Sequence, residues 1–154
     1  LSNYIRTVES AEGRKYMSLR QSSYDIWLNF FNRNANGKET RISYYDKGPI
    51  LGLLMDIEIR RLTNNRKSLD DVMYMLYHSC FREKGCGFTE AEFWKVCETI
   101  AGSPLEEIRK YVDTTCEIDY LKYLGYAGLV LGSDWQLQKK ECTGIQKVIQ
   151  DSIL

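Results

Sequence analysis

The stretch Pro49-Ile50-Leu51-Gly52-Leu53-Leu54-Met55-Asp56-Ile57-Glu58-Ile59 decides the fold. Its apolar side chains would cover nearly every side of a helix, which is typical of a central buried helix rather than of an amphipathic surface helix. Proline is tolerated at the first position of a helix and is disruptive further in. We therefore predict a central helix that begins at Pro49 and ends near Leu62, with Tyr45 upstream of it in a loop or strand end.

Helices are also predicted on the N-terminal side of this stretch. Residues 1–11 carry apolar side chains at the spacing of one helix face, and Gly13 ends that helix. Ser22 or Ser23 can cap a short second helix. Residues 32–40 are rich in Asn and Gly, which is typical of a polar loop.

The C-terminal side is predicted to contain three capped helices, one short helix and three short strands. The second and third of the capped helices begin with capping boxes, a Ser or Thr followed three positions later by Glu. We expect the helices at residues 68–81, 89–102, 103–114 and 119–124. We expect the strands at residues 127–131, 135–138 and 145–149. The predicted fold class is mainly α, a helical bundle-like unit with a short β-rich stretch at the C-terminus.

Length and composition narrow the classes of function. The 154 residues are enough for one domain with a real core, and 44% of them are hydrophobic. The chain has 21 basic and 21 acidic residues, and this balance argues against a nucleic-acid or membrane-surface partner, which needs a basic face. The longest apolar run, residues 49–55, is too short to span a bilayer.

Metal-ligating and acid–base residues are scarce in the sequence. The one histidine, His78, excludes an HExxH pair, and a lone histidine is a poor metal site, so we expect a structural or surface role. The five cysteines show no metal-type spacing and are expected to be free and mostly buried, although a Cys80–Cys86 disulfide is an alternative. The pairs Asp70-Asp71 and Glu106-Glu107 fall in first turns of helices, where negative charge is favourable without any catalytic role.

Six short motifs occur in an order that resembles the glycyl aminopeptidase family of zinc metallopeptidases. The resemblance covers roughly residues 1–131, and one departure is Pro49, where a small residue is expected. The motifs are Gly13-Arg14, Ser22-Ser23-Tyr24-Asp25-Ile26-Trp27, Ser43-Tyr44-Tyr45-Asp46-Lys47-Gly48, Ser68-Leu69-Asp70-Asp71-Val72-Met73, Gly87-Phe88-Thr89-Glu90 and Gly125-Tyr126-Ala127-Gly128-Leu129.

The resemblance implies a thermolysin-like peptidase followed by a PDZ domain. In it, residues 1–125 would form a helical subdomain of the catalytic region, and residues 126–154 a linker and the start of a truncated PDZ-like domain. Residues 144–152 would be the first strand and turn of that PDZ domain. The implied partners are the upstream catalytic domain of the same polypeptide and a peptide substrate. The implied cofactor is zinc, bound by residues outside this chain.

The resemblance also implies a role for Tyr45. In this family a zinc ion activates water against a peptide carbonyl, and a tyrosine donates a hydrogen bond to the oxyanion that develops. A phenol suits this task because it stays protonated at neutral pH. On the pattern alone, Tyr45 is one of eleven tyrosines and packs structurally. Its neighbour Tyr44 is expected to pack in the core.

Two functions follow from these observations. In the first, the chain is a fragment of a zinc aminopeptidase that supplies Tyr45 and part of the substrate pocket wall, and is inactive alone. In the second, it is a non-catalytic helical interaction or scaffold module. The chain begins at Leu1 rather than Met, so we expect any targeting segment to lie upstream. We also expect an exposed apolar patch near Tyr45 that a second copy of the chain could cover.

Overall fold

The computed structural model describes residues 1–31 and 41–154, so the polar loop predicted at residues 32–40 lies outside the described residues. The described part is mainly helical with one small sheet near the C-terminus, which confirms the predicted fold class. In chain order the elements are α1 (Ser2–Ser10), η1 (Glu12–Lys15), α2 (Leu19–Tyr24), α3 (Ile26–Phe31), α4 (Tyr44–Leu62), α5 (Leu69–Leu76), η3 (Tyr77–Arg82), α6 (Glu90–Ala101), α7 (Glu106–Asp113), α8 (Tyr120–Tyr126), β1 (Leu129–Leu131), β2 (Leu137–Lys139) and α9 (Gly144–Ile153).

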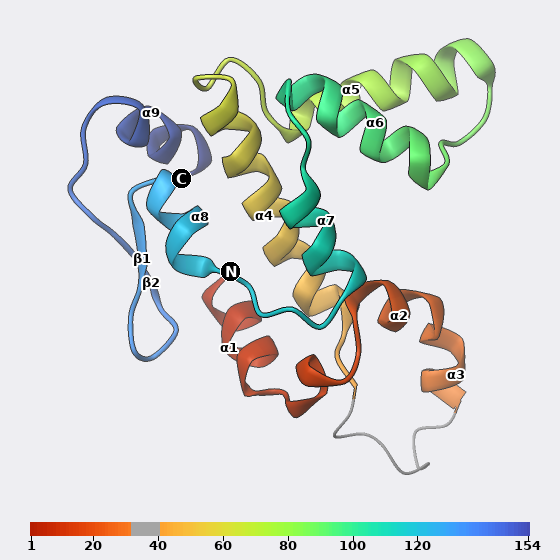
Figure 1. The fold of residues 1–154 in the computed structure, drawn as a ribbon, viewed down its shortest axis with the longest axis horizontal. Helices are drawn as coiled ribbons and strands as arrows, with labels where there is room; N and C mark the ends of the chain where they lie inside the picture. Colours follow the sequence, from red (N-terminus) through yellow and green to blue (C-terminus); the bar gives the residue numbers. More distant parts are fainter. Residues whose placement is uncertain (32–40) are drawn as a thin grey trace.

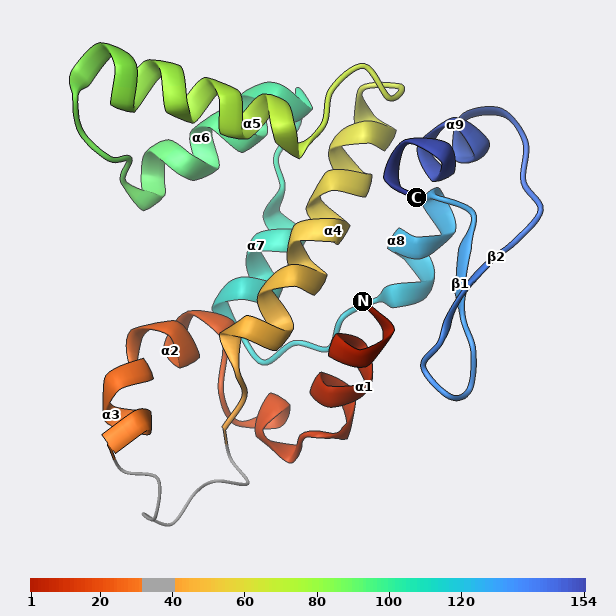
Figure 2. The ribbon, with the colours of Figure 1, turned by 180° about the vertical axis from the view of Figure 1, so that it is seen from behind.

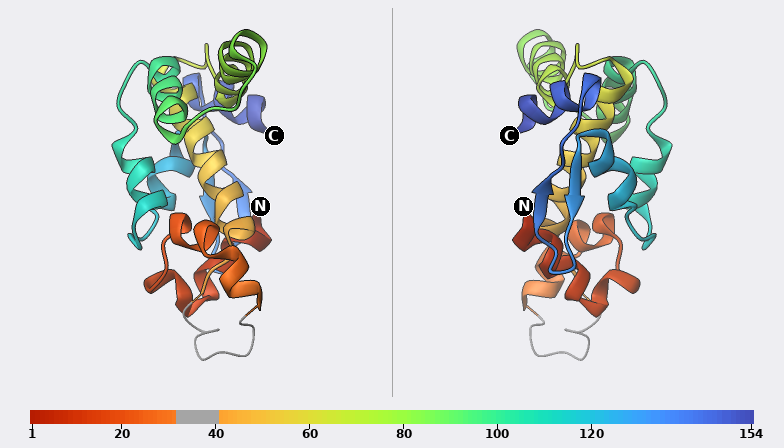
Figure 3. Two further views of the ribbon diagram at one scale, coloured as in Figure 1. Left: turned by 90° about the vertical axis from the view of Figure 1, so that its right-hand side faces the viewer. Right: turned by 90° about the vertical axis from the view of Figure 1, so that its left-hand side faces the viewer.

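The helix α4 is the centre of the molecule, as predicted. It runs between α1, α8 and α9 on one side and α7 on the other (Figure 1), and the view from behind shows the same order (Figure 2). Seen from its narrow sides, the molecule has α5 and α6 at one end and α2 and α3 at the other (Figure 3). Ile57 and Ile59 of α4 are fully buried. The described part of the chain contains no helix long and apolar enough to cross a membrane.

The start of α4 differs from the prediction. The helix begins at Tyr44, and Pro49 lies inside it rather than at its first position. Ser43 caps the helix, because its Oγ accepts a hydrogen bond from the backbone N–H of Tyr45 at 3.2 Å. Proline has no N–H to donate to the carbonyl four residues earlier, so Pro49 removes only the bond to Tyr45. Tyr45 therefore sits in the first helical turn and not in a loop.

Two of the predicted helix starts are confirmed by their hydrogen bonds. The backbone N–H of Ser68 donates to the Asp71 carboxylate at 2.9 Å, and the backbone N–H of Thr89 donates to Glu92 at 2.8 Å. Both are capping boxes. The helix that follows Thr89 ends at Gly102, which adopts a left-handed conformation there, as predicted.

Other predicted caps are wrong. The helix α7 begins at Glu106 and has no side-chain cap, so Ser103 does not open it. Neither Ser22 nor Ser23 caps the second helix; the N–H of Gln21 donates to Ser18 Oγ at 3.1 Å instead. At both helices a different residue occupies the N-cap position, Leu105 at α7 and Ser18 at α2.

Gly13 does not end α1 but lies in the turn η1, which follows it. A Cβ atom at this position would lie 2.0 Å from the backbone oxygen of Arg41. The absence of a side chain therefore allows η1 to lie directly on the segment that leads into α4. This contact sets the position of Arg14 relative to the first turns of α4.

The C-terminal region contains a hairpin and a helix. The strands β1 and β2 pair antiparallel with Val130 opposite Gln138, in agreement with two of the three predicted strands. The strand predicted at residues 145–149 is wrong, because α9 occupies this position. Ile149 is fully buried and packs in the same core as Leu129. The division into a helical unit and a PDZ-like start stays a prediction.

All five cysteines are free, but only Cys80 and Cys97 are buried. Burial raises the pKa of the Cys97 thiol to about 12. We expect iodoacetamide near neutral pH to label the exposed Cys86 much faster than Cys97, because the thiolate is the reacting form. Mass spectrometry of the digested protein gives both rates. Equal rates in the native protein would contradict the fold around Cys97, and all five cysteines should react alike in denaturant.

Candidate functional site

Tyr45 lies on the surface at the first turn of α4. Its side chain is 68% exposed. The backbone that carries it is held by Ser43, which caps the helix, and by the hydrogen bonds of the Asp46 and Lys47 N–H groups to the Ser43 carbonyl, both 3.1 Å. The phenol therefore faces solvent from a rigid position. An exposed and well-anchored donor can reach a group that approaches from outside the chain.

Tyr44 and Tyr45 form a pair. Their ring centroids are 4.2 Å apart and the rings are tilted by 31°. A side-chain hydrogen bond with Tyr45 raises the pKa of Tyr44. Tyr44 therefore packs against Tyr45 at the start of α4 and limits the positions that its ring can take.

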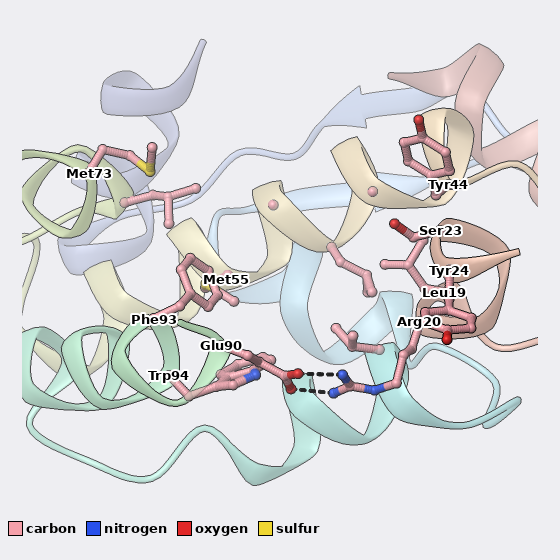
Figure 4. A pocket seen from close by; sticks show the side chains of 15 residues that line it. Leu19, Arg20, Ser23, Tyr24, Tyr44, Met55, Met73, Glu90, Phe93 and Trp94 are labelled. Atoms are coloured by element: carbon pink, nitrogen blue, oxygen red, sulfur yellow. Dashed lines mark hydrogen bonds and ion pairs between the residues drawn. The ribbon is translucent and has the colours of Figure 1, made fainter. Parts of the chain in front are cut away.

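A large apolar groove lies beside this tyrosine pair, with a volume of about 640 Å³. Figure 4 shows Tyr44 at one end of the groove and Met73 at the other, with Met55 of α4 between them. Tyr44 is thus half-buried and lines the groove, and it is not part of the core, where we had expected it. The groove is lined by Leu19, Arg20, Ser23 and Tyr24 of α2, Tyr44, Gly48, Leu51, Gly52 and Met55 of α4, Leu69 and Met73 of α5, Glu90, Phe93 and Trp94 of α6, and Val112 of α7.

One ion-pair cluster crosses the side of the groove. The Arg20 guanidinium of α2 makes a bidentate pair with the Glu90 carboxylate of α6 (Figure 4). Its Nε also donates to Asp113 of α7 at 2.9 Å. The hydrogen bond to Glu90, followed by the one to Asp113, raises the pKa of Arg20, and Arg20 lowers the pKa of Glu90. The cluster links three helices around an otherwise apolar space, and no local pattern in the sequence indicates it.

The described residues do not fit the zinc site that the family implies. They contain no group of three or more His, Cys, Asp or Glu side chains that could hold a metal ion. His78 is in η3, and its ring centroid lies 4.2 Å from that of Tyr74 with the rings tilted by 40°, which agrees with the structural or surface role predicted for it. Asp71 caps α5 and Glu107 pairs with Lys122, so these carboxylates have structural roles as predicted.

The exposed Tyr45 and the half-buried Tyr44 thus lie together at the start of α4, beside the groove. A family model described as M61 glycyl aminopeptidase matches residues 1–51 of the chain. The matched segment runs from α1 through the first two turns of α4 and includes Tyr45. The match supports the interpretation of the chain as a fragment of a peptidase of this family. No curated protein and no solved structure matches the chain.

Proposed function

We propose that the chain is the helical part of a zinc-dependent aminopeptidase of the glycyl aminopeptidase family, in which Tyr45 donates a hydrogen bond to the oxyanion. One observation carries this proposal. The matched segment includes the start of α4, and there Tyr45 is exposed and anchored rather than packed in the core. The zinc of such an enzyme would be held by residues outside this chain, in the upstream catalytic domain of the same polypeptide.

In this role Tyr45 is a single hydrogen-bond donor that is already in position before the reaction. When a peptide carbonyl becomes tetrahedral, its oxygen gains negative charge, and a donor already in position stabilises this charge without reorganising. The contact with the Tyr44 ring, 4.2 Å away between ring centroids, supports this role, because it holds the phenol of Tyr45 in position. Tyr44 is then a positioning residue and Tyr45 the catalytic one.

The groove beside Tyr44 is the proposed binding site for part of the peptide substrate. Its apolar lining and its volume of about 640 Å³ fall in the range of small-ligand pockets, roughly 300–1,000 Å³. We propose that it forms part of the substrate pocket wall and accepts an apolar side chain of the peptide. Tyr44 lies at one end of the groove and its ring is 4.2 Å from that of Tyr45, so we propose that a peptide seated in the groove extends past Tyr44 to Tyr45.

The experiment uses the natural polypeptide that contains this chain, with zinc content and cleavage of aminoacyl substrates as readouts. We expect Tyr45→Phe to retain zinc and to lower turnover by about a hundredfold to a thousandfold, the usual cost of losing one oxyanion donor. Tyr16→Phe is the matched control, since Tyr16 is 64% exposed and lies in the same matched segment. It should leave turnover unchanged.

Three outcomes separate the parts of this proposal. Unchanged turnover in Tyr45→Phe would remove the catalytic role of Tyr45 and leave the family assignment intact. Loss of zinc in the variant would mean that Tyr45 acts on the fold of the enzyme and not on the reaction. A natural polypeptide that binds no zinc and cleaves no aminoacyl substrate would contradict the peptidase function.

The second candidate function is a helical interaction module without catalysis. The observation that favours it is the amount of apolar surface around the tyrosine pair. Tyr24, Trp27 and Leu28 are 88%, 68% and 63% exposed on α2 and α3, and Tyr24 also lines the groove. Such a surface suits a partner protein or a second copy of the chain. A polypeptide without zinc or activity that sediments as a dimer would support this function instead.

A further inference from the structure

A second pocket of about 150 Å³ lies away from the groove. It is formed where α1, η1 and the connection between α7 and α8 meet the first turns of α4, and it includes Lys47. Lys47 is two residues after Tyr45, or about 200° around the helix axis, so the two side chains leave α4 in nearly opposite directions. The pocket is therefore separate from the surface that carries Tyr45.

Lys47 is the unusual residue in this pocket. It is only 3% exposed, although lysine is almost never buried without a partner. Within the described part of the chain, its ammonium makes no hydrogen bond or ion pair. Burial lowers the pKa of Lys47, while the charges of Glu9 and Cys116 oppose this shift. The Lys47 side chain is buried, and its ammonium has three N–H donors that no acceptor among the described residues takes up.

A second cationic donor without a partner lines the same pocket. Arg14 Nε donates to the Glu9 carboxylate at 3.2 Å, and its Nη2 lies 3.8 Å from Glu117. The remaining Nη1 atom is buried and has no hydrogen-bond partner. Guanidinium N–H groups are strong donors, and a buried one without an acceptor is uncommon in folded proteins. The pocket thus holds two cationic groups with unused donors.

The acidic residues of the pocket do not satisfy these donors. Glu9 accepts from the Tyr120 hydroxyl at 2.8 Å as well as from Arg14, so its carboxylate is already held. Glu117 lies at the rim with a side chain 80% exposed. In the interior, Lys47 and Arg14 outnumber Glu9, which leaves one positive charge in excess. An anion would therefore find both charge and donors in this pocket.

We propose that this pocket binds a small oxyanion, a carboxylate or inorganic phosphate, between the Lys47 ammonium and the free Nη1 of Arg14. The volume limits the ligand, since about 150 Å³ corresponds to roughly five water molecules at about 30 Å³ each. A group of four or five heavy atoms fits and a nucleotide or peptide does not. This site requires neither zinc nor Tyr45, so it stands independently of the peptidase function.

The experiment titrates the full chain with sodium acetate or with sodium phosphate at constant ionic strength, with sodium chloride as the reference salt. The readouts are calorimetric binding and the midpoint of thermal unfolding. We expect a saturable signal with at least one oxyanion and none with chloride, because a ligand that binds only the folded state raises the midpoint. Saturation with acetate alone identifies a carboxylate ligand, and saturation with phosphate alone identifies phosphate.

Lys47→Met tests the role of the buried ammonium. Methionine keeps most of the side-chain volume and removes the charge, and we expect at least about tenfold weaker binding, since a hydrogen bond to a charged group is lost. The variant should fold, because replacing a buried charge without a partner by an apolar group removes a desolvation cost. Lys95→Met is the control: it makes the same change of charge on the exposed face of α6 and should leave binding unchanged.

The proposal is overturned if no oxyanion gives a saturable signal, which would mean that water alone fills the pocket. Binding by Lys47→Met as tight as that of the unmodified chain would also overturn it. Should Lys47→Met fail to fold, backbone amide shifts of the unmodified chain during the titration decide instead. Shifts confined to Cys116, Glu117 and their neighbours support the site, and shifts confined to other regions contradict it.

Discussion

Gly13→Ala should lower the free energy of unfolding by about 3 kcal/mol or more. The new Cβ atom would lie 2.0 Å from the Arg41 oxygen and 2.3 Å from its carbonyl carbon. Both are backbone atoms, so no side chain can move aside, and either η1 or the segment before α4 must shift. Urea unfolding followed by circular dichroism measures the change.

Gly52→Ala is the matched control for this substitution. A Cβ atom at Gly52 meets nothing within 4 Å, and the residue lies inside α4. Alanine has the higher helix propensity, so we expect the free energy of unfolding to rise by up to about 1 kcal/mol. If both substitutions change stability equally, the close approach of Gly13 to Arg41 does not exist in solution.

Ile57→Ala should be the second large effect, with a loss of about 4 kcal/mol in the free energy of unfolding. Ile57 is fully buried in the central helix and belongs to the core that joins both ends of the chain. Truncation removes apolar contacts and leaves a cavity that the surrounding helices can fill only in part.

The control for Ile57 is Leu121→Ala on α8, because Leu121 is 77% exposed. Its effect should stay within about 0.5 kcal/mol. Both values come from the same denaturant titration. A loss below about 1 kcal/mol for Ile57→Ala would contradict the central position of α4.

The sequence predicted those parts of the fold that depend on neighbouring residues. The helix starts at Ser68 and Thr89 were correct because each depends on a contact over three residues. The central position of α4 was correct because residues 50–59 are apolar on nearly all sides. Pro49 misled us, since Ser43 caps the helix upstream and a proline in its second turn removes only one hydrogen bond.

Features that depend on distant parts of the chain were not predictable in this way. Ile145, Val148 and Ile149 fit the spacing of a helix as well as a short apolar strand, and only packing against α4 and α8 decides between them. The groove needs five helices around one space, and the burial of Lys47 needs η1 and the α7–α8 connection. The one available signal for Lys47 was its place in the motif that carries Tyr45.

The position of α4 has a consequence for how the chain folds. Its apolar surface is covered by α1 from one end of the sequence and by α8 and α9 from the other. During synthesis α4 leaves the ribosome well before α8 and α9 exist, so part of its surface stays open to water for that time. Exposed apolar segments of this kind make folding intermediates prone to aggregation. The helices α8 and α9 are therefore the elements that close the core around α4.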